Sequence, residues 1–458
     1  MRIMHVSECF GGGVYEMVCN LSAGLADHGH EVAIAYGVRD ETPSPLRAGV
    51  DPRVELIPTP WTERTLRASL RASRELRPVV GAWNPDVIHL HSSFAGVVGA
   101  ATLSGIAPTV YTPHGYSFTM KASRIRRTVF RGLERRVARQ VQLIGAVSDA
   151  EAHLAREVVS APRVKIVPNG IPELDPHWVA RRHIAPAGGV VAMGRIVAQR
   201  QPQEAAEILA GVRDLATVTW LGGGAPCPEL QALEQAEIPV TGWLSREEAL
   251  NRLAAAQVYL HWTAWDGMAL SVLEAMARGV VVIASDIPAN RSILGAGQVF
   301  STKDDAIAAI RRVLTDGAYH QSLLREQGAR RTPYGSTAMT LAWQSLYEGL
   351  ARDSELRSRE IPSTPDAPDR EGGQRAIPLR RPRAPQPSGQ ERLQNARTHS
   401  QVDGSGRYDR HTAVPPRGTG CKRGIDDVLP QQLQRDGRDG GILLGGSADD
   451  HGVTAGVR

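Results

Sequence analysis

The sequence predicts an α/β protein with two doubly wound parallel-sheet domains that face each other across a cleft, followed by a disordered C-terminal tail. Short β-rich runs alternate with helical segments, and such alternation is typical of βαβ units and parallel sheets. The turn-rich stretch 166–176 interrupts the alternation, which then restarts. A chain of 458 residues is long enough for two or three domains.

The first domain is expected to cover residues 1–172. The run VYEMVCNLSAGLADHG between its first two strands has apolar residues at helical spacing. The β-rich runs of this domain are short and aliphatic, as the strands of a buried parallel sheet are. The expected strands are 2–7, 31–37, 54–58, 87–92, 108–114, 142–148 and 164–170.

The second domain is expected to cover residues 187–335, and a helix at 336–351 is expected to pack back on the first domain. Ligands of open α/β sheets bind beyond the carboxyl ends of the strands, and the motifs described below lie at such ends. The expected strands are 190–195, 217–222, 240–244, 258–262 and 280–285.

The tail, residues 352–458, is rich in Pro, Gly, Arg and Asp, and Tyr408 is its only aromatic residue. Such a segment buries too little apolar surface to offset the entropy lost when its backbone is ordered. We therefore expect it to be disordered. An out-of-frame extension is an alternative that the composition leaves open.

Composition narrows the class of protein. Hydrophobic residues make up 42% and charged residues 22%, as in soluble globular proteins. No apolar run approaches the ~18–20 residues needed to span a bilayer, and the N-terminus enters a strand without a signal-peptide pattern. The four cysteines lack metal-binding spacing. We therefore expect a cytoplasmic protein with reduced thiols.

One segment accounts for the net charge of +5. Residues 121–139 hold one Lys, seven Arg and one Glu. On a helix, Ile125, Val129, Leu133 and Val137 fall on one side. Two interpretations stay open: a packed helix with a solvated basic face, or a peripheral contact with anionic lipid on the inner face of the cell membrane.

The stretch WDGMALSVLEAMARG, residues 265–279, predicts an anion site. Asp266 is expected to cap a helix that begins near Met268, and Gly267 lets a ligand approach the backbone. The free amides at the helix end then face an anion, and Glu274 accepts hydrogen bonds from ribose-like vicinal hydroxyls. The alternative is a plain N-cap and a solvated glutamate.

Two arginines follow the first strand of the second domain, in GRIVAQRQP. Arg195 is expected to end that strand, and Arg200 follows five residues later. Their forked donors suit a diphosphate. The alternative is two unremarkable surface arginines in an arginine-rich chain.

Two further motifs lie in the first domain. In CFGGGVYE, glycines between a strand and a helix allow a ligand to contact the backbone. The spacing is not G-x-G-x-x-G and the second strand lacks a terminal acid, so dinucleotide binding is not expected. In TPHGYSF, His114 closes a strand and could contact a substrate hydroxyl, or it is a turn histidine satisfied by the backbone.

Taken in order, these motifs resemble those of glycosyltransferase family 4. GGG, His114-Gly115, VSDAE, VPNG, GRIVAQR and Asp266…Glu274 follow the family's order from Met1 to about residue 350. The resemblance implies two Rossmann-like domains, the GT-B fold, and a retaining, metal-independent transferase that uses a nucleotide-diphosphate sugar. It implies no cofactor.

The resemblance also implies residue roles. The catalytic residues are Arg195 and Arg200, which hold the donor diphosphate, Asp266, which contacts hydroxyls of the transferred sugar, and His114, which lies near that sugar. Glu274 binds the ribose. Further donor contacts are expected from Gly12, Gly13, Gly267, Met268, Ala269 and Leu270. Arg200 replaces the usual Lys and Asp266 the usual Glu, which leaves the identity of the donor open.

The implied acceptor is a glycan, a lipid-linked glycan or a small-molecule hydroxyl, in the synthesis of a cell-surface polysaccharide or glycoconjugate. Two other functions stay open: a non-catalytic sugar-nucleotide-binding protein, and a sugar-nucleotide epimerase of the same fold. Nucleic acid is not an expected partner, because the basic residues lack interleaved aromatic residues for base stacking.

Overall fold

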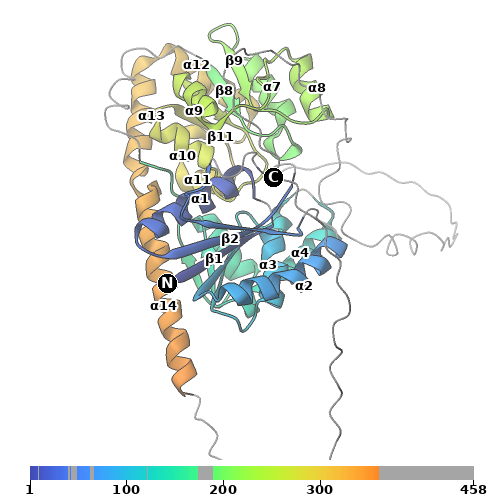
Figure 1. Cartoon of the computed structure of the whole chain (residues 1–458). Coiled ribbons are helices and arrows are strands. Elements are labelled where there is room, and N and C mark those ends of the chain that lie inside the picture. The colour runs from blue at the N-terminus through green and yellow to red at the C-terminus, as the bar shows by residue number, and fades with distance from the viewer. Residues whose placement is uncertain are drawn as a thin grey trace, which may run out of the picture. The chain divides into compact units, whose positions relative to one another are not determined.

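A computed structural model of the chain describes residues 1–8, 10–39, 42, 49–61, 66–120, 122–173 and 189–360. It contains two parallel sheets in one compact unit, so the predicted α/β class with two doubly wound domains is confirmed (Figure 1). The tail beyond Glu360 lies outside the described residues, so the disorder predicted there stays a prediction.

The first sheet has seven strands in the order β3-β2-β1-β4-β5-β6-β7, and every neighbouring pair is parallel. The chain moves outward from β1 to β3 and then returns to the other side of β1 with β4, so the strand order reverses between β1 and β4. Its strands are β1 Arg2–Ser7, β2 Glu31–Gly37, β3 Glu55–Thr59, β4 Val87–His91, β5 Thr109–Thr112, β6 Leu143–Ala146 and β7 Val164–Ile166.

Helices cover both faces of this sheet because its strands are apolar on both faces. Met4 and Val6 of β1 pack in one core with residues of α2, α3 and α4, and these helices lie together in Figure 1. Ile3 of β1 packs in the other core with α1. The helices are α1 Gly12–Asp27, α2 Leu66–Trp83, α3 Ser93–Thr102, α4 Arg124–Gln140 and α5 Asp149–His153.

The second sheet has five parallel strands in the order β12-β11-β10-β8-β9. Its strand order reverses between β8 and β10. Its strands are β8 Val190–Met193, β9 Val218–Leu221, β10 Val258–His261, β11 Val281–Ser285 and β12 Val299–Phe300. Its helices are α7 Pro202–Ala210, α8 Pro228–Gln235, α9 Arg246–Ala255, α10 Leu270–Ala277, α11 Pro288–Ile293, α12 Lys303–Thr315 and α13 Gly317–Arg330.

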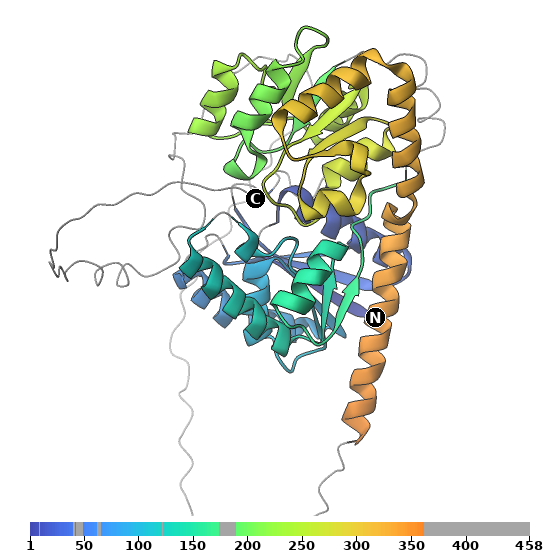
Figure 2. The same ribbon diagram turned by 180° about the vertical axis from the view of Figure 1, so that it is seen from behind.

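A last helix, α14 Ser336–Glu360, follows the second sheet and runs beside the first (Figure 2). A Cβ added to Gly145 of β6 would meet the Trp343 ring at 2.0 Å, and Tyr347 contacts His89 of β4. The helix continues past Arg352, where the sequence predicts disorder to begin, because this segment still carries helix-forming residues and the i,i+4 ion pair of Arg352 with Glu348.

Two details of the predicted strands are wrong. The run 240–244 forms only isolated bridges at Val240 and Gly242, since Gly242 has φ +72° and breaks the extended backbone. β12 was not expected, because two residues are too few to show a pattern. None of the helices in the described part of the chain is long and apolar enough to cross a membrane.

Candidate active site

The site can be built from the point where the second sheet reverses its strand order. The loops that follow β8 and β10 leave the sheet in opposite directions at this point. Their side chains line the crevice between them, at the carboxyl edge of the sheet. The loop after β8 carries Arg200, and β10 ends at His261. Nη1 of Arg200 lies 3.4 Å from Nε2 of His261, so these two loops meet.

Arg200 and Asp266 form the charged centre of the site. Nη1 of Arg200 donates to Oδ2 of Asp266 at 3.0 Å, and the amide of Gly267 donates to Oδ1 at 2.9 Å. Both side chains are mostly buried. Asp266 therefore does not cap α10, contrary to the expectation: the helix begins at Leu270, and its N-cap Ala269 makes no side-chain hydrogen bond.

Behind this pair, a short hydrogen-bond chain orients His261. The hydroxyl of Tyr259 donates to Ser271 Oγ at 2.8 Å and lies 3.0 Å from Nδ1 of His261. The proton of neutral His261 is then on Nδ1, which leaves Nε2 to accept from Arg200. Burial, followed by the charge of Arg200, lowers the pKa of His261 well below its usual value, so the ring stays uncharged.

Glu274 is buried, with 3% of its surface exposed, so it is not a solvated helix residue. Nη2 of Arg246 donates to its Oε1 at 2.6 Å, and Nε of Arg246 lies 2.9 Å from Oε2 of Glu16. Glu16 lies on α1, four residues after Gly12. The glycine turn and Glu274 are therefore joined through one arginine.

His114 comes from the first domain and lies beyond the end of β5. Its φ of +54° is rare for a residue with a Cβ, so the turn holds the backbone under strain. Its backbone presses on Gly267: a Cβ at Gly267 would lie 2.9 Å from the His114 carbonyl carbon and 2.8 Å from the Gly115 amide nitrogen. Only glycine fits at 267, and the two domains touch there.

Two side chains of the first domain contact the same loop, and a third fixes the Gly115 turn beside it. Ser148 Oγ donates to the carbonyl of Gly267 at 3.2 Å, and Nδ2 of Asn169 donates to the carbonyl of Met268 at 3.1 Å. Glu151 accepts from the Gly115 amide at 2.6 Å and from Val147. Burial raises the pKa of Glu151 to about 7. The VSDAE and VPNG motifs thus hold the 266–268 loop in place.

Arg195, Gly12 and Gly13 are the predicted site residues that face open space. Arg195 follows β8 by two residues instead of ending it, and it is exposed with no polar partner among the described residues. A Cβ added to Gly12 or Gly13 would meet nothing within 4 Å. Gly12 has φ +56°, which glycine adopts without strain.

The structure therefore brings Arg200, Asp266, Gly267 and His114 into one set of contacts, and Met268 and Leu270 continue the same loop. Sequence reasoning assigned no role to His261, Arg246 or Glu16. His261 had a weak signal, because it is a polar residue at the end of a buried strand. Arg246 and Glu16 had none, since their contacts to Glu274 cross the fold.

Two family models match the chain. That of Glycosyltransferase Family 4 matches residues 11–173, and that of Glycosyl transferases group 1 matches residues 187–316. Together they span most of the two sheet domains.

Several curated proteins are similar in sequence. A 41.2 kDa protein of the cps region of Klebsiella pneumoniae is 26% identical over 46% of this chain, which spans 63% of that protein. An Escherichia coli UDP-Gal:alpha-D-GlcNAc-diphosphoundecaprenol alpha-1,3-galactosyltransferase is 24% identical over 53% of this chain and 68% of its own. The MMP alpha-(1->4)-mannosyltransferase of Mycolicibacterium hassiacum is 28% identical over 74% of this chain and 93% of its own length.

Solved structures share the fold. Sucrose-phosphate synthase from Thermosynechococcus elongatus superimposes with a TM-score of 0.65 at 17% identity, over 77% of this chain and 100% of its own. Anabaena HepE in complex with UDP-glucose superimposes with a TM-score of 0.60 at 14% identity, over 76% of this chain and 100% of its own. Because the two family models match in order across both sheets, the chain belongs to the family 4 glycosyltransferases with the GT-B fold.

Proposed function

We propose that the chain moves a sugar, with retention of configuration, from a nucleotide-diphosphate sugar to a hydroxyl of a glycan, lipid-linked or small-molecule acceptor, in the synthesis of a cell-surface polysaccharide or glycoconjugate. The observation that carries the proposal is the Arg200–Asp266 pair next to Gly267, which presses on the backbone of His114 and Gly115. The names of the relatives support the chemistry, since they include a UDP-galactose donor and a diphosphoundecaprenol-linked acceptor.

The donor diphosphate is proposed to lie against Arg195, Arg200 and the loop 267–270, with the amides of residues 268–270 as donors. Among the described residues, the Arg195 guanidinium and the amides at the uncapped start of α10 have no hydrogen-bond partner. The sequence has no D-x-D pair in residues 1–350, which supports neutralisation by guanidinium groups and amides rather than by a metal. The open surface over Gly12 and Gly13 leaves room for the phosphates.

The remaining groups are proposed to handle hydroxyls. Glu274 accepts from the ribose while Arg246 holds the carboxylate in place. Asp266 accepts from the transferred sugar, and His114 lies beside it. The acceptor oxygen forms a bond to the anomeric carbon on the face that the diphosphate leaves. The bond from that carbon to the phosphate oxygen breaks, and the phosphate takes the acceptor's proton.

A thermal-shift panel with UDP-, GDP-, ADP- and dTDP-sugars identifies the donor, because a bound ligand raises the melting temperature by mass action. Transfer is then measured for Arg195→Ala and Glu274→Ala. Each should lose at least about tenfold in rate, the effect of one lost charge-assisted contact. Wild-type rates in both variants would rule out the assignment, and an isomerised donor without acceptor would show an epimerase instead.

We also propose that α4 contacts an anionic membrane surface. Ile125, Val129 and Leu133 share one side of the helix and are 77%, 41% and 36% exposed, so this side is not packed; of the four apolar residues predicted to share it, Val137 is buried. Exposed arginines flank the stripe. An apolar stripe with a basic border is typical of helices that lie in a lipid interface. Lys121 lies outside the described residues.

Flotation with phosphatidylglycerol-containing vesicles tests this contact. Arg136→Ser with Arg139→Ser should weaken binding about tenfold or more, because each basic residue near an anionic surface contributes about 1 kcal/mol. Ile125→Ser should also weaken it. Arg325→Ser and Leu341→Ser are matched controls, since both residues are exposed on other helices. Absence of salt-sensitive binding by the wild type would remove the proposal.

A further inference from the structure

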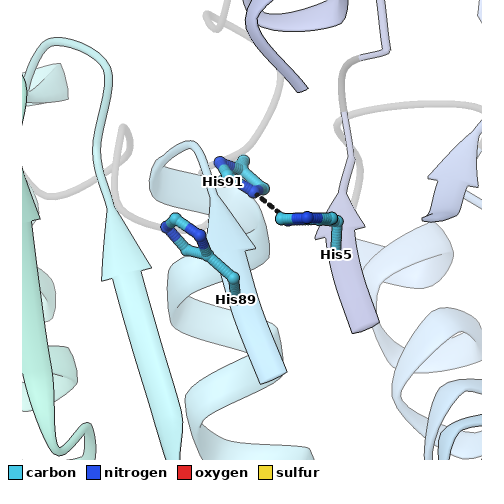
Figure 3. A group of neighbouring side chains, drawn as sticks. All are labelled: His5, His89 and His91. Carbon is cyan, nitrogen blue, oxygen red and sulfur yellow. Dashed lines mark hydrogen bonds between the residues drawn. The ribbon is translucent and has the colours of Figure 1, made fainter. Parts of the chain in front are cut away.

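A chain of three histidines leads from the core of the first sheet to the site. His5 lies on β1, His91 ends β4, and His114 follows β5. Nδ1 of His5 lies 3.0 Å from Nε2 of His91, a contact drawn in Figure 3, and Nδ1 of His91 lies 3.1 Å from Nε2 of His114. β1 and β4 are the strands between which the strand order reverses.

All three rings are uncharged. Burial lowers the pKa of His5 and of His114 to about 3, and it lowers the pKa of His91 well below its usual value. A neutral imidazole has one N–H donor and one acceptor nitrogen. Each nitrogen–nitrogen contact needs one proton, so the three rings must all donate in the same direction along the chain.

The free ends of the chain select the direction. Nε2 of His5 is buried and has no hydrogen-bond partner among the described residues. A buried N–H without an acceptor is rarer in proteins than a buried acceptor without a donor. His5 therefore carries its proton on Nδ1 and donates to His91, and His91 donates from its own Nδ1 to His114.

We propose that His91, backed by His5, is a positioning residue that holds the proton of His114 on Nδ1. Nδ1 of His114 has no hydrogen-bond partner among the described residues, and it is not one of their fully buried unpartnered atoms, so it is accessible. It then donates a hydrogen bond to an oxygen of the bound ligand. The inference rests on the proposed function for the identity of that ligand, a sugar hydroxyl of the donor.

A metal site is the competing interpretation, since ring nitrogens of His5, His89 and His91 lie within 4.8 Å of one another. His89, however, already contacts Tyr347 at 2.6 Å and Thr112 at 2.8 Å through its two nitrogens. Both nitrogens of His91 are also used. A metal held by all three rings would break at least two of these hydrogen bonds, so the hydrogen-bonded chain fits the observed contacts better.

The tautomer can be read directly from long-range proton–nitrogen NMR spectra of the full chain labelled with ¹⁵N-histidine. His114→Gln identifies the His114 signal by its loss. In the wild type, that signal should show the proton on Nδ1. In His91→Phe it should shift to the Nε2-protonated form, which free neutral imidazole side chains favour. His91→Asn should restore the wild-type form, because its amide can donate from the position of Nδ1.

Tyr347→Phe is the matched control. It removes one buried hydrogen bond from the same cluster but leaves the His5–His91–His114 contacts intact, so the His114 signal should not change. Under the proposed function, His91→Phe should lower kcat/KM about fivefold, the scale of one neutral hydrogen bond, and His91→Asn should stay within about twofold of the wild type.

Three outcomes would overturn the inference: a wild-type His114 protonated on Nε2, an unchanged tautomer in His91→Phe, or one equivalent of zinc in the purified chain by elemental analysis. The wild-type spectrum decides even if His91→Phe fails to fold. Because it needs no turnover, it separates this inference from the proposed function. A chain without transferase activity but with the expected tautomers would reject only the latter.

Discussion

The two sheets present different chemistry at their carboxyl ends. At the first sheet, neutral imidazoles lie near the buried acids Glu134 and Glu151, which contact no cation among the described residues, although buried Glu8 after β1 pairs with Arg39. At the second, the mostly buried Asp266 and the buried Glu274 each contact a guanidinium. The unpaired buried acids therefore lie on one side of the site.

This difference matches the two kinds of group in a sugar nucleotide. A diphosphate needs cations and amides, which the second sheet supplies through Arg200 and the start of α10. Sugar hydroxyls can be bound by neutral groups such as His114, or by carboxylates that already contact a cation, because an unpaired charge would have to be desolvated for each weak contact. Burial keeps the histidines of the first edge neutral, whereas pairing stabilises the charged acids of the second.

The largest expected effect concerns the unpaired acids. Burial raises the pKa of Glu134 from 4.5 to about 7, so the native state holds this proton more tightly than the unfolded state does. The contribution of Glu134 to stability is then fully present below pH 4.5 and is lost as the pH rises through 7, whereas the buried neutral histidines contribute the opposite trend on acidification. The linkage predicts a loss of about 3 kcal/mol over this window. The free energy of unfolding in urea at pH 5 and pH 8 measures it.

Glu134→Gln should keep its contacts to the hydroxyls of Ser93 and Tyr111 and lose the titration. Because all other groups titrate equally in both proteins, the stability of the wild type relative to this variant should fall by about 3 kcal/mol between pH 5 and pH 8. A variant as pH-sensitive as the wild type would mean that Glu134 is ionised in the folded chain, and the contrast between the two sheets would fail.

The second prediction tests the charged side. Under the proposed function, Arg200→Ala should lower kcat/KM about 10- to 100-fold, because it removes the proposed charge-assisted contact to the diphosphate and leaves Asp266 without its cation. The kcat/KM of Arg200→Lys should lie between those of the wild type and Arg200→Ala, since lysine keeps the charge but not the forked pair of N–H donors. Arg213→Ala, which breaks an exposed pair with Glu237, is the control. Equal rates in all three variants would remove Arg200 from the site.

Sequence patterns predicted what depends on local order. Alternating runs identified most of the strands, and the ordered motifs pointed to Arg200 and Asp266, which do touch. The start of α10 was missed because the carboxylate of Asp266 binds Arg200 instead of the helix end. The partner of Glu274 was missed for a different reason: Arg246 lies 28 residues away and Glu16 far earlier, so only the folded chain brings them together.

The smallest effect is expected from a substitution that leaves a paired buried acid without its cation. Arg246→Gln removes the cation from Glu274, which is buried, and from Glu16. Because Arg246 is itself about one-third exposed, water screens the pair, and we expect a loss of about 1–2 kcal/mol at pH 8.

Two variants make this last test specific. Arg246→Gln combined with Glu274→Gln should recover most of the stability at pH 8, since no buried charge then remains at position 274. Arg252→Gln, which breaks the exposed i,i+4 pair with Glu248 on the same helix, should cost only about 0.3–0.5 kcal/mol. If Arg246→Gln behaves like Arg252→Gln, the guanidinium does not stabilise the buried carboxylate. The two sheet edges would then differ only in their residues, and pairing with a cation would not be what stabilises the buried acids of the second edge.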